Sequence, residues 1–287
     1  MNFHPIQIED KFLFEQYYKD NTSMGSEVSF ATPYTWAKSY NIAICESDNL
    51  LCLRGQTNKS PLYYLMPVGT GDKISLIRKL YALCQAENRP FMMQGIYKED
   101  IELIKAALPD VPLSYHASRD ASEYIYEASS LVSLAGKKLH AKRNHVNAFK
   151  KTYAYHTEKI NDKNVADAAS FVFARCNSDE ETVAMKRFFD AYFSLDVIGM
   201  LLYVDNQIVA VTAGEFLNPE TALIHLEKAS TDYTGSYAAV NQLFIEKYFV
   251  SATYVNREED MGIEGLRRAK MSYRPAFLLD KYMVWEG

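Results

Sequence analysis

Cysteine is scarce in this sequence, and the cysteines form no metal-binding or cross-linking pattern. The four of them are far apart and lie inside apolar segments: Cys45, Cys52, Cys84 and Cys176. There is no Cys-x-x-Cys pair, no Cys/His cluster, and no Gly-x-Ser-x-Gly, His-Glu-x-x-His or phosphate-loop motif. The sequence therefore predicts no metal site, no disulfide framework and no covalent nucleophile of a familiar kind.

An export signal and a long apolar run are also missing. The first five residues, which begin Met1-Asn2, contain no basic segment followed by an apolar one. The most apolar stretch, residues 197–211, is interrupted by Asp205-Asn206, which indicates a β-hairpin and not a span of roughly 20 residues. A formal charge of −5 and a pI of about 5.7 exclude a generally basic nucleic-acid binder, so DNA is not an expected partner. We expect a cytoplasmic protein, with peripheral contact to a membrane left open.

The composition is that of a folded protein with about two domains. Apolar residues make up 48% of the 287 residues and charged residues 23%, which excludes disorder. Short apolar runs alternate with helical periodicities in both halves, so we expect an α/β fold with mixed α+β character. The predicted domains cover residues 1–132 and 133–287, and a basic helix at about residues 133–151 is expected to join them.

The second half has a defined order of predicted elements. A strand and two helices are followed by the hairpin, a third strand, a turn and a helix, then strand, short helix and strand. The strands and helices after the hairpin are expected at residues 222–229, 237–248, 253–256, 264–271 and 281–285. The first half repeats this plan, with a strand at residues 124–126 closing it. The order resembles that of a GNAT acyltransferase domain.

Acidic residues are absent from residues 128–157, although six Lys or Arg side chains occur there. Helical spacing directs four apolar side chains to the buried side: Ala135, Leu139, Val146 and Phe149. The basic side chains opposite them form a stripe that attracts anions. We expect a phosphate-bearing donor to be bound by three neighbouring residues: Lys142, Arg143 and Asn144. The alternative is a linker helix with a solvated basic face.

A second candidate segment runs from Glu227 through the turn at Gly235 into a helix. A strand that ends in a small-residue turn at a helix start presents unpaired backbone N–H groups, which suit a phosphate. The expected donor contacts are Thr234, Gly235, Ser236, Tyr237 and Ala238. The alternative is an ordinary strand-to-helix turn capped by Ser236.

A third candidate segment follows the strand at residues 253–256. An acidic turn that contains Asp260 precedes a short basic helix that carries Lys270. Carboxylates at a helix start and cations at its end complement the helix dipole, so a structural explanation suffices for this charge pattern. The functional alternative is that Lys270 stabilises a developing oxyanion.

With these segments in view, the chain resembles the C-terminal catalytic domain of phosphatidylglycerol lysyltransferases in a stand-alone form, over essentially its whole length. The resembling stretches are residues 124–131, 137–145, 227–239 and 260–270. A more distant likeness is to Fem-type peptidoglycan aminoacyltransferases. The resemblance implies two tandem GNAT-like acyltransferase domains and an aminoacyl-tRNA donor. The acyl-CoA loop pattern fits only in part, because Asp232 stands at its basic position and Tyr237 at its last small position.

The sequence therefore predicts an acyltransferase or aminoacyltransferase that acts by direct attack of an amine or hydroxyl on an activated carbonyl. Glu227 or Asp260 is expected to take the proton, and Lys270 to stabilise the oxyanion, as the resemblance implies. No tightly bound cofactor is expected, because aminoacyl-tRNA or acyl-CoA would be a donor substrate. The acceptor is left open between a lipid and a small molecule. Two alternatives remain: an acyl-CoA-dependent N-acyltransferase, and a non-catalytic binding protein with a retired transferase fold.

Overall fold

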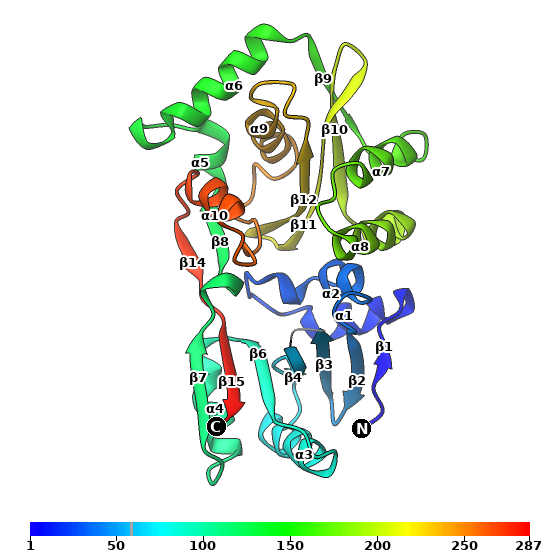
Figure 1. Ribbon diagram of the computed structural model, residues 1–287, viewed down its shortest axis with the longest axis vertical. Coiled ribbons are helices and arrows are strands. Elements are labelled where there is room, and N and C mark those ends of the chain that lie inside the picture. Colours follow the sequence, from blue (N-terminus) through cyan, green and yellow to red (C-terminus); the bar gives the residue numbers. More distant parts are fainter. Residues whose placement is uncertain (58–59) are drawn as a thin grey trace. The chain divides into compact units, whose positions relative to one another are not determined.

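The computed structural model of the chain describes residues 1–57 and 60–287, and these residues fall into two compact units (Figure 1). Unit 1 consists of Met1–Asn21, Glu27–Ser122 and Asp280–Gly287. Unit 2 consists of Thr22–Ser26 and Glu123–Leu279. The division falls at Ser122, ten residues before the boundary expected from the sequence, and the last eight residues belong to unit 1.

Unit 1 contains a mixed sheet in the strand order β1-β2-β3-β4-β6-β15-β7, with β5 paired to β3. Its strands are β1 (His4–Pro5), β2 (Ala43–Ser47), β3 (Leu50–Thr57), β4 (Ser60–Tyr64), β5 (Val68–Gly69), β6 (Met92–Ile96), β7 (Leu113–Ala117) and β15 (Tyr282–Glu286). Its α-helices are α1 (Lys11–Tyr18), α2 (Ala31–Trp36), α3 (Lys73–Ala86) and α4 (Ile101–Ala107). The Asp72 side chain caps α3 by accepting from the N–H of Ser75, as the sequence predicts.

Unit 2 contains a sheet in the order β14-β8-β13-β12-β11-β10-β9. Its strands are β8 (Glu123–Glu127), β9 (Tyr155–Lys159), β10 (Ile198–Val204), β11 (Gln207–Asn218), β12 (Thr221–Ala229), β13 (Tyr254–Asn256) and β14 (Phe277–Leu279). Its α-helices are α5 (Ala128–Ser133), α6 (His140–Thr152), α7 (Val165–Phe173), α8 (Asp179–Asp190), α9 (Ser236–Tyr248) and α10 (Glu264–Met271). In the described residues, no helix is long and apolar enough to cross a membrane.

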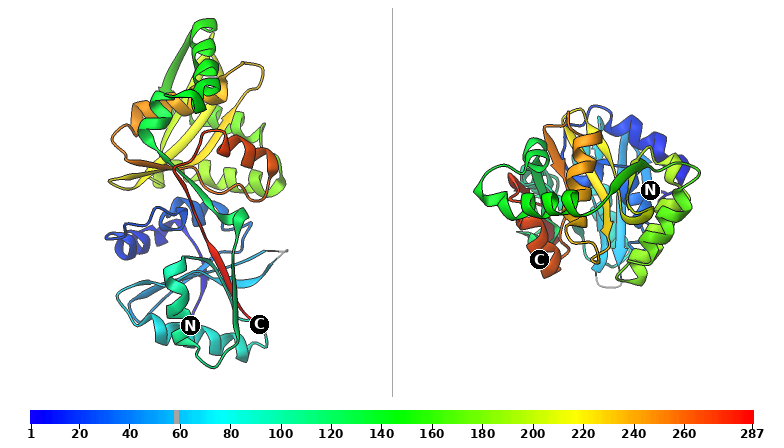
Figure 2. Two further views of the ribbon diagram at one scale, coloured as in Figure 1. Left: turned by 90° about the vertical axis from the view of Figure 1, so that its left-hand side faces the viewer. Right: turned by 90° about the horizontal axis from the view of Figure 1, so that it is seen from above.

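Helices cover both faces of the unit 2 sheet. Alternate residues of β10, Met200 and Leu202, share a core with Phe149 of α6 and Phe244 of α9. Helices α7 and α8 lie on the other side of these strands, as the view from above shows (Figure 2). The β10–β11 hairpin turns at Asp205 and Asn206, whose φ values of 48° and 64° match a two-residue hairpin turn. The hairpin prediction is therefore confirmed.

Each sheet contains a strand from the other half of the sequence. Strand β8 was expected to close the first half, but it pairs with β13 and β14 in unit 2. Strand β15 was expected to close the second half, but it pairs with β6 and β7 in unit 1. Both expectations were wrong, because sequence proximity favours pairing with the preceding elements and cannot detect an exchange of equivalent strands.

The two parallel strands at the centre of unit 2 separate soon after they pair. Strands β12 and β13 match at only three positions, which end at Leu223 and Asn256. The rest of β12, from Ile224 to Ala229, pairs only with β11, which runs along its other edge. The sheet is consequently open on one side of β12 at the level of Glu227.

The basic helix belongs wholly to unit 2. Helix α6 begins at His140 and packs on α9, so it is not a connector between the units. Leu139, Val146 and Phe149 are buried as expected. Ala135 is exposed, because it lies in the loop between α5 and the short turn at Lys137–Leu139 and is outside the helical periodicity. The close packing rests on Gly235, since a Cβ at that position would lie 2.4 Å from the carbonyl oxygen of His145.

Gly235→Ala is expected to destabilise unit 2, because φ at Gly235 is +88° and the added methyl group would push α6 outward. Gly136→Ala is the matched control, since φ there is +81° but nothing lies within 4 Å of the added Cβ. We expect Gly235→Ala to cost about 1–3 kcal/mol more than the control in urea denaturation. Equal losses would mean that α6 does not press on Gly235.

Candidate functional site

A buried ion pair occupies the opening between β12 and β13. An Nη2 atom of Arg257, directly after β13, lies 3.0 Å from Oε1 of Glu227 on β12. The Nδ2 atom of Asn241 on α9 donates to the other carboxylate oxygen at 2.9 Å. The Arg257 and Glu227 side chains are only 11% and 12% exposed. Three elements therefore fix one carboxylate in a sheltered position.

Aromatic rings and a second cation complete the cluster. The Arg257 guanidinium lies 4.8 Å from the ring centroid of Tyr273 and 5.7 Å from that of Tyr126. The Lys142 ammonium, from α6, lies 4.2 Å from the centroid of Tyr273. Burial raises the pKa of Tyr273 to about 12, so its phenol stays protonated at neutral pH. We call Glu227, Arg257, Asn241, Lys142 and Tyr273 the Glu227 cluster.

Two buried polar atoms of the Glu227 cluster have no partner within the described part of the chain. They are Oδ1 of Asn241, an acceptor, and Nη1 of Arg257, a charged donor. A buried polar atom without a hydrogen bond costs about 1–3 kcal/mol, so such atoms point to a ligand or an ordered water. Burial and the Arg257 charge together lower the pKa of Lys142, while Glu227 opposes that change. The cluster can therefore offer a proton acceptor, two cationic donors and a neutral acceptor to a bound molecule.

Asp260, the other expected proton acceptor, is completely buried and fully engaged. Its carboxylate accepts hydrogen bonds from the guanidinium of Arg267, the phenol of Tyr124 and the backbone N–H of Gly262. Burial raises the pKa of Asp260, but these bonds outweigh that effect and hold the pKa well below its usual range. A carboxylate of such low pKa is a weak general base, so Asp260 fits a structural role in the loop after β13.

Backbone carbonyl oxygens of the loop after β13 engage the ammonium of Lys270. Its Nζ atom donates to the backbone carbonyl oxygens of Arg257 at 2.6 Å and Glu258 at 3.1 Å, and also to that of Glu259. Burial lowers the pKa of Lys270. An ammonium has three N–H groups, and all three are used here, so none is left for an oxyanion. Lys270 instead holds the loop that carries Arg257.

The three candidates on α6 fall into two groups, because Lys142 contacts Tyr273 while Arg143 and Asn144 both contact His140. Lys142 joins the Glu227 cluster, whereas Arg143 donates to the carbonyl oxygen of Leu134 at 2.6 Å and lies beside His140. Asn144 contacts the other nitrogen of His140 at 3.0 Å. Arg143, Lys137, Gly136 and His140 line a shallow hollow of about 530 Å³. The expected basic stripe is therefore divided between a half-buried cation at the Glu227 cluster and a basic hollow on the surface.

The turn before α9 is ordered by its own side chains. Ser236 donates its hydroxyl to the carbonyl oxygen of Ser230 at 2.6 Å, and Asp232 accepts from the Ser230 hydroxyl at 3.0 Å. Gly235 is covered by α6, Ala238 is buried and Tyr237 is exposed, while Thr234 precedes the glycine in the turn. The first N–H groups of α9 have no acceptor within the helix. The carboxylate of Asp232 adds negative charge to this turn.

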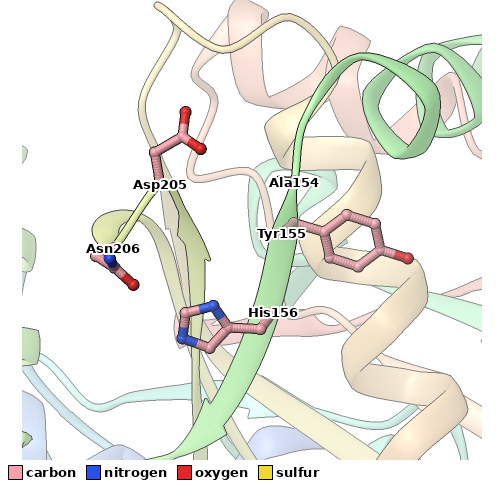
Figure 3. A pocket seen from close by; sticks show the side chains of 5 residues that line it. All are labelled: Ala154, Tyr155, His156, Asp205 and Asn206. Atoms are coloured by element: carbon pink, nitrogen blue, oxygen red, sulfur yellow. The ribbon is translucent and has the colours of Figure 1, made fainter.

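A second hollow, of about 340 Å³, lies at the edge of the sheet between β9 and the hairpin turn. It is lined by Ala154, Tyr155, His156, Asp205 and Asn206. Figure 3 shows His156 pointing toward Asp205 and Asn206, while Tyr155 points away from them. No residue of the Glu227 cluster lines this hollow. Across the described ranges, no group of three or more His, Cys, Asp or Glu side chains is arranged to hold a metal ion.

Sequence reasoning selected Glu227 and Lys142 but missed Arg257, Asn241 and Tyr273. One signal for Asn241 was available in the sequence, because a polar residue directly follows Val240 on the apolar side of the predicted helix. In the structure Asn241 is 2% exposed. Arg257 also had a signal, because it directly follows a predicted strand. Neither signal identified a partner, since the five residues of the Glu227 cluster come from five separate segments of the sequence.

A family model described as "Phosphatidylglycerol lysyltransferase, C-terminal" matches residues 19–285 of this chain. A curated relative from Mycoplasmoides gallisepticum, an uncharacterized protein, is 28% identical over 67% of this chain. The match covers 65% of that relative, so the chain spans slightly less than two thirds of it.

Solved structures resemble the chain along its whole length. A conserved protein of unknown function from Bacteroides thetaiotaomicron is 32% identical, with 100% of both chains covered and a TM-score of 0.92. The C-terminal domain of a putative lysylphosphatidylglycerol synthetase from Agrobacterium fabrum is 13% identical, with a TM-score of 0.67 over 98% of this chain and 91% of that one. A tandem GNAT protein of clavulanic acid biosynthesis is 10% identical, with a TM-score of 0.52 over 100% and 98%. The fold is that of two tandem GNAT-like domains.

Lys270→Met is expected to lower the melting temperature, because three carbonyl oxygens of one loop would lose a charged donor. We expect a loss on the order of 3 kcal/mol in the free energy of unfolding. Arg268→Met is the matched control on the same helix, since Arg268 is 75% exposed and pairs only with the exposed Glu264 among the ion pairs of the described residues. An unchanged melting temperature together with lost turnover would restore the oxyanion role for Lys270.

Proposed function

Because the chain belongs to the family of phosphatidylglycerol lysyltransferase C-terminal domains, we propose that it transfers an activated acyl group to an amine or hydroxyl acceptor at the Glu227 cluster. The donor proposed is an aminoacyl-tRNA. The observation that carries the proposal is a pair of buried atoms, Asn241 Oδ1 and Arg257 Nη1, that have no hydrogen-bond partner among the described residues and belong to the two side chains bound to the Glu227 carboxylate. Buried polar atoms without a partner beside a buried ion pair mark a place where a bound molecule can supply the missing hydrogen bonds.

The chemistry that we propose is direct attack on the carbonyl carbon of the donor. The acceptor nitrogen or oxygen forms the new bond while Glu227 takes its proton. The carbonyl oxygen becomes negative, and the free N–H of Arg257 and the ammonium of Lys142 stabilise it. The bond between the carbonyl carbon and the ribose oxygen of the tRNA then breaks, and the ribose oxygen leaves with the proton that Glu227 took from the acceptor. No covalent enzyme intermediate is needed.

Two observations favour an aminoacyl donor over an acyl-CoA. The free Oδ1 of Asn241 and the Glu227 carboxylate suit the N–H groups of an amino acid, which an acetyl group lacks. Asp232 places a carboxylate in the turn where the pyrophosphate of coenzyme A would bind in an ordinary GNAT domain, and like charges repel. The exposed hollow of Lys137, His140 and Arg143 supports binding of a polyanion such as tRNA.

The direct test offers the purified protein both donors. One reaction contains total tRNA charged with ¹⁴C-labelled amino acids and vesicles of phosphatidylglycerol, and the other contains ¹⁴C-acetyl-CoA with a mixture of amines. We expect label to move from the tRNA to an acceptor. Transfer only from acetyl-CoA would favour the N-acyltransferase alternative. Binding of either donor with no transfer to any acceptor would favour the other alternative, a non-catalytic binding protein that has a transferase fold.

Glu227→Gln is expected to lower turnover about 10²–10⁴-fold, because the amide keeps the shape of the carboxylate but cannot accept the proton. Glu181→Gln is the matched control, since Glu181 pairs at 2.6 Å with Lys228, the next residue of β12, outside the Glu227 cluster. Turnover is measured at saturating donor, and donor affinity by a thermal shift. A Glu227→Gln protein with the turnover of the control would remove Glu227 as the proton acceptor.

Lys142→Met is expected to lower kcat/KM about 100-fold, because a cation beside the developing oxyanion acts mainly in the transition state. Lys151→Met serves as the control, since Lys151 is exposed on the same helix. An equal and modest fall in kcat/KM in both variants would contradict this role. If the difference from the wild type also disappears at high salt concentration, the lysines act only through general attraction of the donor.

A further inference from the structure

His225 is a nearly buried histidine of β12 whose two ring nitrogens face different carboxylates. Its Nε2 atom lies 2.8 Å from Oε1 of Glu215 on β11, and its Nδ1 atom lies 3.5 Å from Oε1 of Glu258. The side chain is 6% exposed. A neutral imidazole has one N–H donor and an imidazolium has two, so only the protonated ring can donate to both carboxylates.

A β-bulge places His225 at the opening of the sheet. The pairing of β11 with β12 shifts between Ala213 and Gly214, which match Leu226 and Ile224 and leave His225 as the extra residue. Bulges redirect side chains, and this bulge lies just beyond the last β13 contact at Leu223. Gly214 is needed there, because a Cβ would lie 2.3 Å from the carbonyl oxygen of Leu223.

Glu258, the partner of His225, belongs to the loop that presents Arg257. Its φ of 56° lies in the left-handed region, which is unfavourable for a residue other than glycine. The N–H of Glu258 donates to Oδ1 of Asn256 at 2.7 Å, and its carbonyl oxygen accepts from Lys270. Arg257 directly precedes it, so fixing Glu258 also fixes the start of the Arg257 side chain.

We propose that His225 is a positioning residue, which in its protonated form ties the β12 bulge to Glu258 and so holds Arg257 against Glu227. The contacts of His225 with Glu215 and Glu258 lie within unit 2 and do not depend on any activity. The effect of His225 on turnover rests on the proposed function.

The surroundings of His225 favour its charged form at neutral pH. Burial lowers the pKa of His225, but the hydrogen bonds and charges of Glu215 and Glu258 raise it further, to about 9. Helix α8 contributes an apolar neighbour, the Phe188 ring, with its centroid 6.3 Å from that of the imidazole. The ordinary pKa of histidine is about 6.5, so the stabilisation is complete below that pH. It declines above pH 6.5 and is lost as the pH rises through about 9.

The tie is tested by amide hydrogen exchange of residues 256–262, corrected for the intrinsic effect of pH. His225→Gln is expected to speed exchange of this segment about tenfold at pH 7 and to leave β9 unchanged. His156→Gln is the control, since His156 is half-exposed and stacks on Tyr203, away from the Glu258 loop. Glu258→Gln, which leaves the bond between His225 and Glu215 in place, is the second variant if His225→Gln does not fold. Unchanged exchange in the folded variants would overturn the proposal.

A titration separates positioning by charge from simple packing. In ¹⁵N NMR spectra of the labelled histidines, the resonance that His225→Gln removes should titrate near pH 9, and Glu258→Gln should lower that midpoint. A midpoint near 6.5 would overturn the proposal, because most of the rings would then be neutral at pH 7.

Turnover separates this proposal from the proposed function. With a transfer assay in hand, kcat of the wild type should fall above about pH 9, while His225→Gln should lower kcat about tenfold at pH 7 with little change in KM and lose that pH dependence. Normal kcat in His225→Gln would overturn the positioning role alone. Faster loop exchange in a protein that transfers nothing would support the tie and overturn the proposed function.

Discussion

The separation of β12 from β13 is the constraint on which the site depends. Parallel strands in the middle of a sheet usually hydrogen-bond along their length, but these two stop at Leu223 and Asn256. Beyond that point the edge of β12 faces an opening, and side chains fill the space that a strand would occupy. Glu227 and Arg257 meet there, covered by the rings of Tyr126 and Tyr273. An interior gap in a sheet gives charges the low-dielectric surroundings in which their hydrogen bonds are strongest.

Charges buried in that gap require a rigid support, since a misplaced ion loses its partner while it remains desolvated. The loop after β13 provides the support through several independent attachments. Lys270 holds its carbonyl oxygens, and the Asp260 carboxylate closes its far end on Arg267 and Tyr124. Asn256 ties its beginning to the backbone of Met24 and to the buried Glu123. The unfavourable φ at Glu258 persists because these contacts together determine the loop conformation.

The exchange of strands makes each sheet depend on the whole sequence. Strand β8 fills a place between β13 and β14, and β15 fills the equivalent place between β6 and β7. In unit 2 the exchanged strand supplies Tyr124 and Tyr126, whose phenols donate to Asp260 and to the carbonyl oxygen of Lys270. The first half of the sequence thus contributes directly to the support of the Glu227 cluster. A cut between residues 132 and 133 would place β8 and its partners β13 and β14 on different fragments. It would also place β15 and its partners β6 and β7 on different fragments.

The sequence by itself determined the local elements and two members of the site. Asp72 as a helix cap, the hairpin at Asp205-Asn206 and the helix at residues 264–271 follow from short-range rules of capping, turn geometry and periodicity. The tertiary structure alone decided the exchange of β8 and β15, the different contacts of Lys142 and Arg143, and the use of Lys270 as a loop support. Those features depend on which distant elements pack together. Packing across more than a hundred residues of sequence leaves no periodic signal, because each partner alone looks like an ordinary charged or apolar side chain.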